Sequence, residues 1–119
     1  YRVVVKTGDR PFSGTDSEVM LRMKGQLRST GTHRLSSCPV NHRTLFQRGA
    51  HDEFIIQDWD IGTLRQLSIW HDAKGSDPHW FLDKVVVTDQ QGRACTFKCG
   101  EWLSPTEGQR KLRAELTPS

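Results

Sequence analysis

The chain has 119 residues, of which 34% are hydrophobic, and its mean hydropathy is −0.63. A chain of this length fits one domain, and it contains no uninterrupted apolar run of the roughly 20 residues needed to cross a bilayer. Its 17 Lys and Arg residues against 14 Asp and Glu residues give a net charge of +3. This excess suits an acidic partner but is far below the charge of a typical nucleic-acid-binding protein, so we expect no nucleic-acid partner.

Alternation of apolar and polar residues dominates the chain and is typical of half-buried strands. It begins with Tyr1, Val3 and Val5 and returns over residues 19–23, whereas the short segment 30–35 is ambiguous. The remaining alternating segments are rich in β-branched or aromatic residues. They span 53–57, 63–70, 81–88, 94–98 and 109–116.

Gly and Pro residues separate these segments, and no stretch keeps a helical period for three turns. The pattern predicts an all-β fold, an eight-stranded antiparallel β sandwich of two sheets. Because the chain starts at Tyr1 inside an apparent strand, without an initiator Met or a leader, we expect residues 1–119 to be a single domain excised from a larger protein.

Eight strands that alternate in direction bring every second loop to the same end of the sandwich. The loops predicted at one end are 8–16, 37–51, 71–79 and 100–108. The loops predicted at the other end are 25–29, 58–62 and 89–93. The first end is rich in Asp, Gly and basic residues.

Three Cys residues, an odd number, argue against a complete disulfide framework. Cys95 and Cys99 are four residues apart in a predicted strand, about 13 Å, which is too far to bridge. We expect both to be reduced, which favours a cytosolic environment. Pairing of Cys38 with either one in an oxidising compartment is the alternative.

Several separated motifs then identify a family. They are YRVVVKTGD, GTDSEVMLRMKG, LFQRGAHDEFII, IGTLRQLSIWHDAKGSDPHWFLDKVVV and CTFKCGEWL. In this order they resemble the PLAT domain, which polycystins, lipoxygenases and clostridial alpha-toxin share. The WHDAKGSDPHWFLDKVVV segment is similar to polycystins and lipoxygenase-homology repeat proteins. The resemblance implies a sandwich that brings its host protein to membranes or to protein partners, in some members with calcium.

Calcium takes about six to eight oxygen ligands from carboxylates and from carbonyls of flexible, Gly-containing loops. The predicted loop end offers such residues: Asp9, Gly14, Thr15 and Asp16 from the first loop, Asp52 after the second, and Asp72 and Asp77 from the third. The resemblance places calcium ligands, where present, in these loops, and Gly14, Asp16 and Asp72 carry over first. The alternative is that Asp16 and Asp72 only accept hydrogen bonds from turn amides.

Basic side chains of the same loops are candidate contacts for anionic lipid headgroups. They are Arg10, His42, Arg43, Arg48, Lys74 and His79, with Phe12 as an apolar probe. Each basic side chain near an anionic leaflet contributes about 1 kcal/mol, so a few of them give weak, salt-sensitive attraction. The alternative is solvated cations without a specific role. For Arg48 we prefer a structural role, in which its guanidinium folds back onto Asp52 across the turn at Gly49.

The four Trp residues divide into core and surface. Trp70 and Trp80 flank the third loop and are expected to pack in the core, and the resemblance implies that Trp102 packs inward. Trp59 lies on a turn at the opposite end, where we expect it to be exposed and to contact a partner or a bilayer.

No catalytic or zinc motif competes with these assignments. The five His residues lack a recognised zinc-ligand spacing, and no nucleophile elbow accompanies a Ser, His and Asp set. We therefore expect a noncatalytic module that binds anionic phospholipid headgroups on the cytoplasmic side of a membrane, with calcium as a candidate bridge.

The alternative is a protein-protein interaction module that docks a partner or a neighbouring domain on a sheet face or at Trp59. Outward basic residues give this surface the charge for an acidic partner. They are Arg2, Lys6, Arg22, Lys24, Lys84, Lys98, Lys111 and Arg113.

Overall fold

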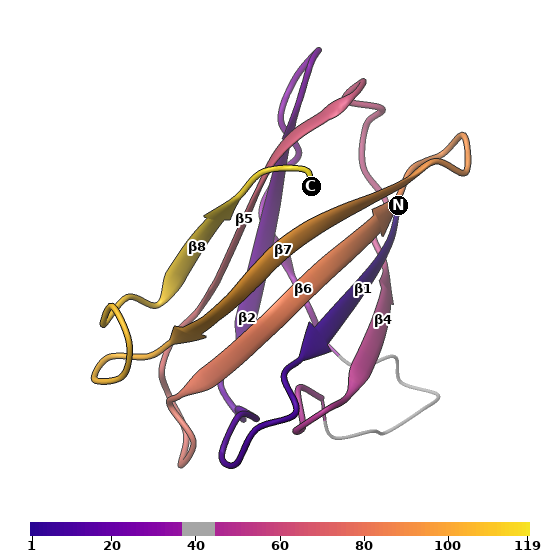
Figure 1. Cartoon of the computed structure of the whole chain (residues 1–119). Helices are drawn as coiled ribbons and strands as arrows, with labels where there is room; N and C mark the ends of the chain where they lie inside the picture. The colour runs from indigo at the N-terminus through magenta and orange to yellow at the C-terminus, as the bar shows by residue number, and fades with distance from the viewer. Residues whose placement is uncertain (37–44) are drawn as a thin grey trace.

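The computed structural model describes residues 1–36 and 45–119, which form eight strands and no helix (Figure 1). The strands are β1 (Arg2–Thr7), β2 (Val19–Gly25), β3 (His33–Arg34), β4 (His51–Ile55), β5 (Leu64–His71), β6 (Trp80–Thr88), β7 (Ala94–Leu103) and β8 (Arg113–Leu116). Among these residues we find no helix with the length and apolar character to cross a membrane.

Two four-stranded sheets face each other (Figure 1). The first sheet has the order β4-β1-β6-β7 and the second the order β3-β2-β5-β8, and all neighbouring strands are antiparallel. This arrangement confirms the predicted antiparallel sandwich of two sheets. The ambiguous segment 30–35 contributes the short strand β3.

The core lies between the sheets because each strand buries alternate residues. On β1, Val3 and Val5 point inward and pair in register with Val87 and Val85 of β6, and all four are fully buried. Complete burial of such a side chain contributes about 1.5 to 3 kcal/mol. Trp80 is fully buried near one end of the core, where its indole N–H donates to Thr7 Oγ1 at 2.9 Å.

Two of the Trp predictions are wrong, and strand alternation explains both. On β5 the inward side is taken by Leu67, Ile69 and His71, so Trp70 lies half-buried on the outer face of the second sheet. Trp102 is half-buried opposite Phe81, with ring centroids 5.3 Å apart, outside the main core cluster.

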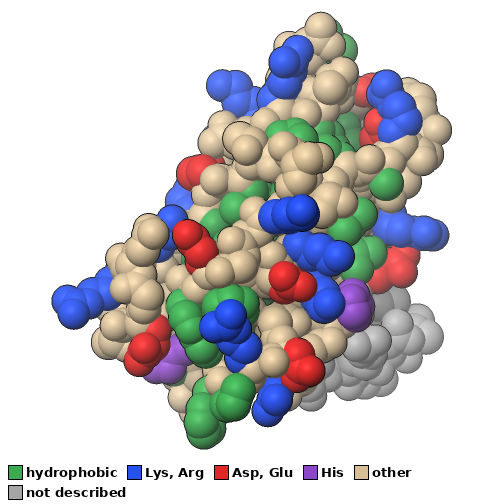
Figure 2. Space-filling view, viewed as in Figure 1, with side chains coloured by type: hydrophobic (Ala, Val, Ile, Leu, Met, Phe, Trp, Pro, Cys, Tyr) green, Lys and Arg blue, Asp and Glu red, His purple; other side chains and the backbone are tan. Residues whose placement is uncertain are grey.

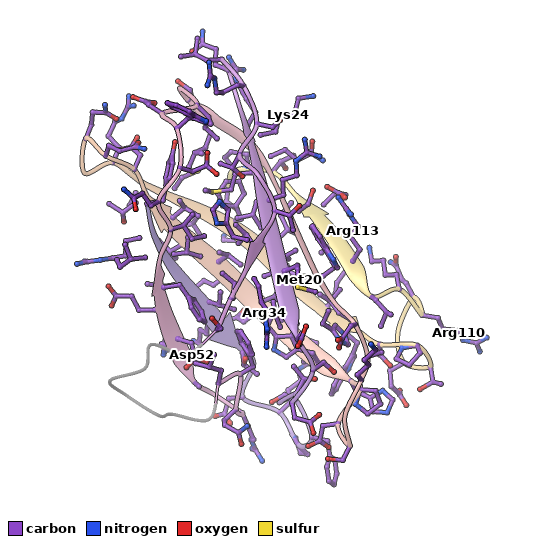
Figure 3. The ribbon with its side chains drawn as sticks, turned by 180° about the vertical axis from the view of Figure 1, so that it is seen from behind. Met20, Lys24, Arg34, Asp52, Arg110 and Arg113 are labelled. Atoms are coloured by element: carbon purple, nitrogen blue, oxygen red, sulfur yellow. The ribbon has the colours of Figure 1, made fainter. Side chains whose placement is uncertain are left out.

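Figure 3 views the second sheet from its outer face, where Met20 and Arg113, the two register partners of Trp70, are labelled. The guanidinium of Arg113 lies 4.4 Å from the centroid of the Trp70 ring. Trp70 therefore packs under a cation on the surface and not in the core.

The predicted grouping of the loops is confirmed (Figure 1). The described residues of the β1–β2, β3–β4, β5–β6 and β7–β8 connections lie together at one end, which we call the loop end; they are 8–18, 35–36 with 45–50, 72–79 and 104–112. The connections 26–32, 56–63 and 89–93 lie at the opposite end.

Cys95 and Cys99 are free and pack partly against the core. Burial raises the pKa of both thiols, that of Cys99 to about 11, so the reactive thiolate is disfavoured in both. Cys38 lies outside the described residues.

Candidate functional site

The β1–β2 and β5–β6 loops are joined at the loop end by the carboxylate of Asp16. It accepts hydrogen bonds from the Ser76 N–H at 3.0 Å, the Ser76 hydroxyl at 3.0 Å and the Asp77 N–H at 2.9 Å. The Asp77 amide, followed by the Ser76 donors, lowers the pKa of Asp16. The carboxylate is therefore ionised and serves as an acceptor for the neighbouring loop.

Two hydroxyl groups beside Asp16 strengthen this junction. Thr15 Oγ1 donates to the Asp77 carbonyl at 2.5 Å, and Ser17 Oγ donates to the Lys74 carbonyl at 2.7 Å. The β1–β2 loop thus contacts the β5–β6 loop through both backbone donors and backbone acceptors. The two loops form one hydrogen-bonded unit.

Asp72 begins the β5–β6 loop and is held in a similar way. Its Oδ1 accepts the Lys74 N–H at 3.0 Å and the Glu18 N–H at 3.2 Å. The Lys74 amide is the main cause of a lowered pKa of Asp72. These contacts correspond to the structural alternative for Asp16 and Asp72, in which both accept hydrogen bonds from turn amides.

Two glycines allow the loops to approach this closely. Gly75 has a φ of +96°, and a Cβ at this position would lie 2.5 Å from Asp16 Oδ1. A Cβ at Gly14 would lie 2.9 Å from the Phe46 carbonyl oxygen, to which the Thr15 N–H donates at 3.0 Å. Gly14 thus packs the first loop against the residues before β4.

The other predicted carboxylates lie in three separate environments. Asp9 is exposed and pairs with Arg48, whose Nε lies 2.8 Å from Asp9 Oδ1. Asp52 is only 1% exposed and accepts the Phe46 N–H at 2.8 Å. Asp77 is exposed, and within the described part of the chain it forms hydrogen bonds through its backbone N–H and carbonyl and not through its carboxylate.

The predicted fold-back of Arg48 onto Asp52 is wrong. Arg48 has the expected structural contact, but with Asp9 across the first loop, because Asp52 points into the protein from β4, where its register partner is the inward-facing Val5.

The predicted calcium ligands are spread over these separate environments. Calcium requires about six to eight oxygen ligands around one point. Among residues 1–36 and 45–119, no three His, Cys, Asp or Glu side chains come together as a metal-ion site. Asp16 and Asp72 direct their oxygens to loop amides, Asp9 to Arg48, and Asp52 to the interior. Calcium binding at the predicted residues stays a prediction.

The candidate lipid contacts differ in availability. Arg10 lies with its guanidinium carbon 4.1 Å from the centroid of the Phe81 ring, Arg48 is paired with Asp9, and Lys74 is exposed. Phe12 is 89% exposed and has a φ of 63°, a backbone conformation uncommon for residues other than Gly. His42 and Arg43 lie outside the described residues.

A surface hollow of about 340 Å³ adjoins Phe12, and sequence reasoning missed it. Its lining residues are Pro11, Phe12, His79, Trp102 and Glu107, which come from three connections and from β7. His79 is fixed there by a hydrogen bond between its Nδ1 and Ser104 Oγ, 2.6 Å apart. The available signal was the CGEWL motif, but Trp102 was expected to face inward.

The opposite end carries a second exposed aromatic residue, as predicted. Trp59 is 68% exposed, and the guanidinium carbon of Arg28 lies 5.3 Å from its ring centroid. Leu27, in the β2–β3 connection at the same end, is 71% exposed. Asp58 positions Trp59 by accepting its N–H at 2.7 Å.

The sequence profile of the family described as PLAT/LH2 domain matches residues 1–114. The chain is 37% identical over 120 residues to lipoxygenase homology domain-containing protein 1 of Mus musculus, covering 100% of this chain and 6% of that protein. It is 31% identical over 120 residues to polycystin-1-like protein 3 of Homo sapiens, covering 99% of this chain and 7% of that protein. The chain thus spans a small part of the relatives it matches.

Solved structures agree with these sequence relatives. Coral 8R-lipoxygenase, whose crystal structure is described in terms of calcium activation via a C2-like domain, has a TM-score of 0.84 and 27% identity, covering 99% of this chain and 16% of that chain. The alpha toxin of Clostridium absonum, at 18% identity and a TM-score of 0.66 over 99% of this chain and 30% of its own, shares the fold. From its sequence and its two-sheet architecture, this chain belongs to the PLAT/LH2 domain family.

Proposed function

We propose that the domain is a noncatalytic membrane-targeting module that presents its loop end to anionic phospholipid headgroups, on the cytoplasmic side of a membrane and as part of a larger protein. The observation that carries the proposal is Phe12, a large apolar side chain held out into solvent beside basic residues. Such an arrangement is unfavourable in water and favourable at a membrane interface.

The fold keeps Phe12 in its outward position through the residues on either side. The Ser13 N–H donates to the Arg10 carbonyl at 3.1 Å, and Ser13 Oγ donates to the Gly8 carbonyl at 2.6 Å. The Ser13 carbonyl in turn accepts the N–H of Phe81 at 2.9 Å. A positive φ at Phe12 persists because these contacts over-determine the turn.

Charge adds to this apolar contact. Arg10 and Lys74 are exposed at the loop end, and each would contribute about 1 kcal/mol next to an anionic leaflet. The expected binding is weak, reversible and sensitive to salt. The likeness to coral 8R-lipoxygenase, whose structure is described in terms of calcium activation via a C2-like domain, supports a role for calcium, but no step of the proposal depends on an ion.

The test is sedimentation with phosphatidylserine vesicles, with and without calcium, against phosphatidylcholine vesicles. We expect the domain to sediment with phosphatidylserine and the variants Phe12→Ala and Lys74→Gln to sediment less. Leu27→Ala is the matched control because Leu27 is 71% exposed at the opposite end. A domain that stays in the supernatant under both calcium conditions rejects the proposal.

The exposed Trp59 favours a second candidate function, the docking of a protein partner or a neighbouring domain at the opposite end. Trp59 lies beside Arg28 and can present an aromatic face and a cation together. Partner binding that survives Asp16→Asn and Asp72→Asn but is lost on Trp59→Ala would favour this function. Partner binding that survives Trp59→Ala but is lost on Asp16→Asn and Asp72→Asn would instead place the binding surface at the loop end.

A further inference from the structure

The outer face of the first sheet carries three lysines directly opposite one another on neighbouring strands. Lys6 of β1 pairs in register with Lys84 of β6, and Lys84 pairs with Lys98 of β7. We call these three residues the lysine row. His51 of β4 is the register partner of Lys6 on its other side, so the row continues across all four strands.

The lysine row works against the stability of the sheet. Like charges directly opposite each other on neighbouring strands are destabilising. Lys6 has a partial counterion in Asp83, 3.5 Å from its Nζ. No ion pair within residues 1–36 and 45–119 includes Lys84 or Lys98. A feature that breaks a local rule without compensation is typical of a functional surface.

Apolar side chains lie beside the row on the same face. Two residues along the strands, Val4 and Val86 are opposite each other and half-buried. On the edge strand β4 the register partner of Val4 is Glu53, which pairs with Arg2, and two residues further along Ile55 is 74% exposed. Figure 2, which views this face, shows Lys and Arg side chains running across its middle, with a His at one end. The face therefore combines a cationic line with an adjacent apolar strip.

We propose that the lysine row binds an acidic amphipathic helix of a partner protein, lying across the strands. Neighbouring strands are about 4.8 Å apart, so the two intervals of the row span roughly 9.6 Å. Carboxylates at positions i, i+3 or i+4, and i+7 of a helix span about 10.5 Å along one stripe. Such a helix can match one carboxylate to each lysine and place an apolar flank on Val4 and Val86.

The shape of this face favours a protein segment over a lipid surface. Val4 and Val86 are half-buried between longer charged side chains, so they can pack against a helix but do not project as Phe12 does. The face also runs along the strands, whereas the loop end lies at their termini (Figure 1). The proposal is therefore independent of membrane binding by the loop end.

The probe is a fluorescein-labelled, helix-forming peptide of about five turns, with Glu residues on one stripe and Leu residues beside it. A second peptide of equal composition has its Glu residues spread around the helix. Fluorescence anisotropy measures the affinity of the domain for both peptides. We expect the domain to bind the striped peptide more tightly than the second peptide, and we expect this affinity to fall as the salt concentration increases.

The decisive comparison uses two triple variants. Lys6→Gln, Lys84→Gln and Lys98→Gln together remove the row, and we expect about tenfold weaker binding of the striped peptide. The control, Arg22→Gln, Lys24→Gln and Arg65→Gln, removes the same charge from exposed positions on β2 and β5 of the second sheet. It is expected to retain most of the affinity. Circular dichroism checks that both variants remain folded.

Three outcomes would overturn the inference: no binding of the striped peptide, equal binding of the two peptides, or equal loss in the two variants. Loss of phosphatidylserine sedimentation by the row variant with unchanged peptide binding would also overturn it, in favour of a lipid surface. Failure of the Phe12→Ala vesicle test alone leaves it standing, so the two proposals fail separately.

Discussion

Asp16 and Asp72 at the loop end and the lysines of the first sheet all carry charge at the protein surface, but the fold uses them differently. Asp16 and Asp72 accept five hydrogen bonds from residues of the β1–β2 and β5–β6 loops, three to Asp16 and two to Asp72. Lys84 and Lys98 face each other without a counterion among the described residues. The acidic residues thus hold the loops, and the basic residues are available to a partner.

The largest effect on stability is expected from removing the buried carboxylate of Asp52, which holds the residues before β4. Asp52→Ala leaves the N–H of Phe46 without its present acceptor, which lies 2.8 Å away. We expect the free energy of unfolding to fall by about 1 to 3 kcal/mol, measured by chemical denaturation. Asp77→Ala is the control, because Asp77 is exposed. Equal effects of the two substitutions would contradict the distinction.

The junction between the two loops can be broken at Gly75. In Gly75→Ala the new methyl group would meet Asp16 Oδ1 at 2.5 Å, at a φ of +96°. We expect a loss of about 1 kcal/mol or more and faster hydrogen exchange at the amides of Ser76 and Asp77. Gly92→Ala has a φ of +82° but nothing within 4 Å of the new atom, so it isolates the backbone effect. Identical exchange in both variants would argue against the Asp16 contact.

His71, the last residue of β5 at the loop end, makes the stability of the fold depend on pH. Its Nε2 lies 2.7 Å from the Leu103 carbonyl and donates to it, while its Nδ1 accepts the Ala73 N–H, so the ring is neutral. Burial is the main cause of a pKa lowered from the ordinary 6.5. As the pH falls below about 6.5, His71 therefore becomes protonated in the unfolded chain before it does in the folded domain.

The stability contributed by neutral His71 is complete above pH 6.5 and is lost as the pH falls to the lowered pKa. Asp16 and Asp72, whose pKa values are lowered from 3.8, lose their contribution only in more acidic solution. Denaturation between pH 8 and pH 5 measures the first window. We expect a smaller slope there for His71→Gln than for the unmutated domain. Equal slopes in the two proteins would exclude His71 as the source.

The smallest effect concerns the lysine row. Lys84→Gln removes one member of a like-charge row, so we expect unfolding free energy to stay constant or rise by a few tenths of a kcal/mol. Lys24→Gln on the second sheet is the matched control. A clear loss of stability in Lys84→Gln, at low and high salt alike, would show that Lys84 supports the fold.

Sequence reasoning succeeded where local patterns decide the structure. Alternation over Val3, Val5 and their counterparts predicted the strands, and counting strand directions predicted which loops meet. The exposure of Trp59 followed from its turn. The errors concern which side chains contact each other. Arg48 pairs with Asp9, 39 residues away along the chain, instead of with the nearby Asp52. Trp102 was misplaced because its face depends on the register with β6.

The amino-acid sequence determined the β strands, the turns between them and the family, because these depend on short-range alternation and on motifs in linear order. Only the tertiary structure decided which charges meet. The register between β1, β6 and β7 aligned three lysines that are far apart in the chain, and loop packing turned Asp16 and Asp72 toward backbone amides. Such pairings depend on distances across strands and between loops, and no local pattern of residues encodes them.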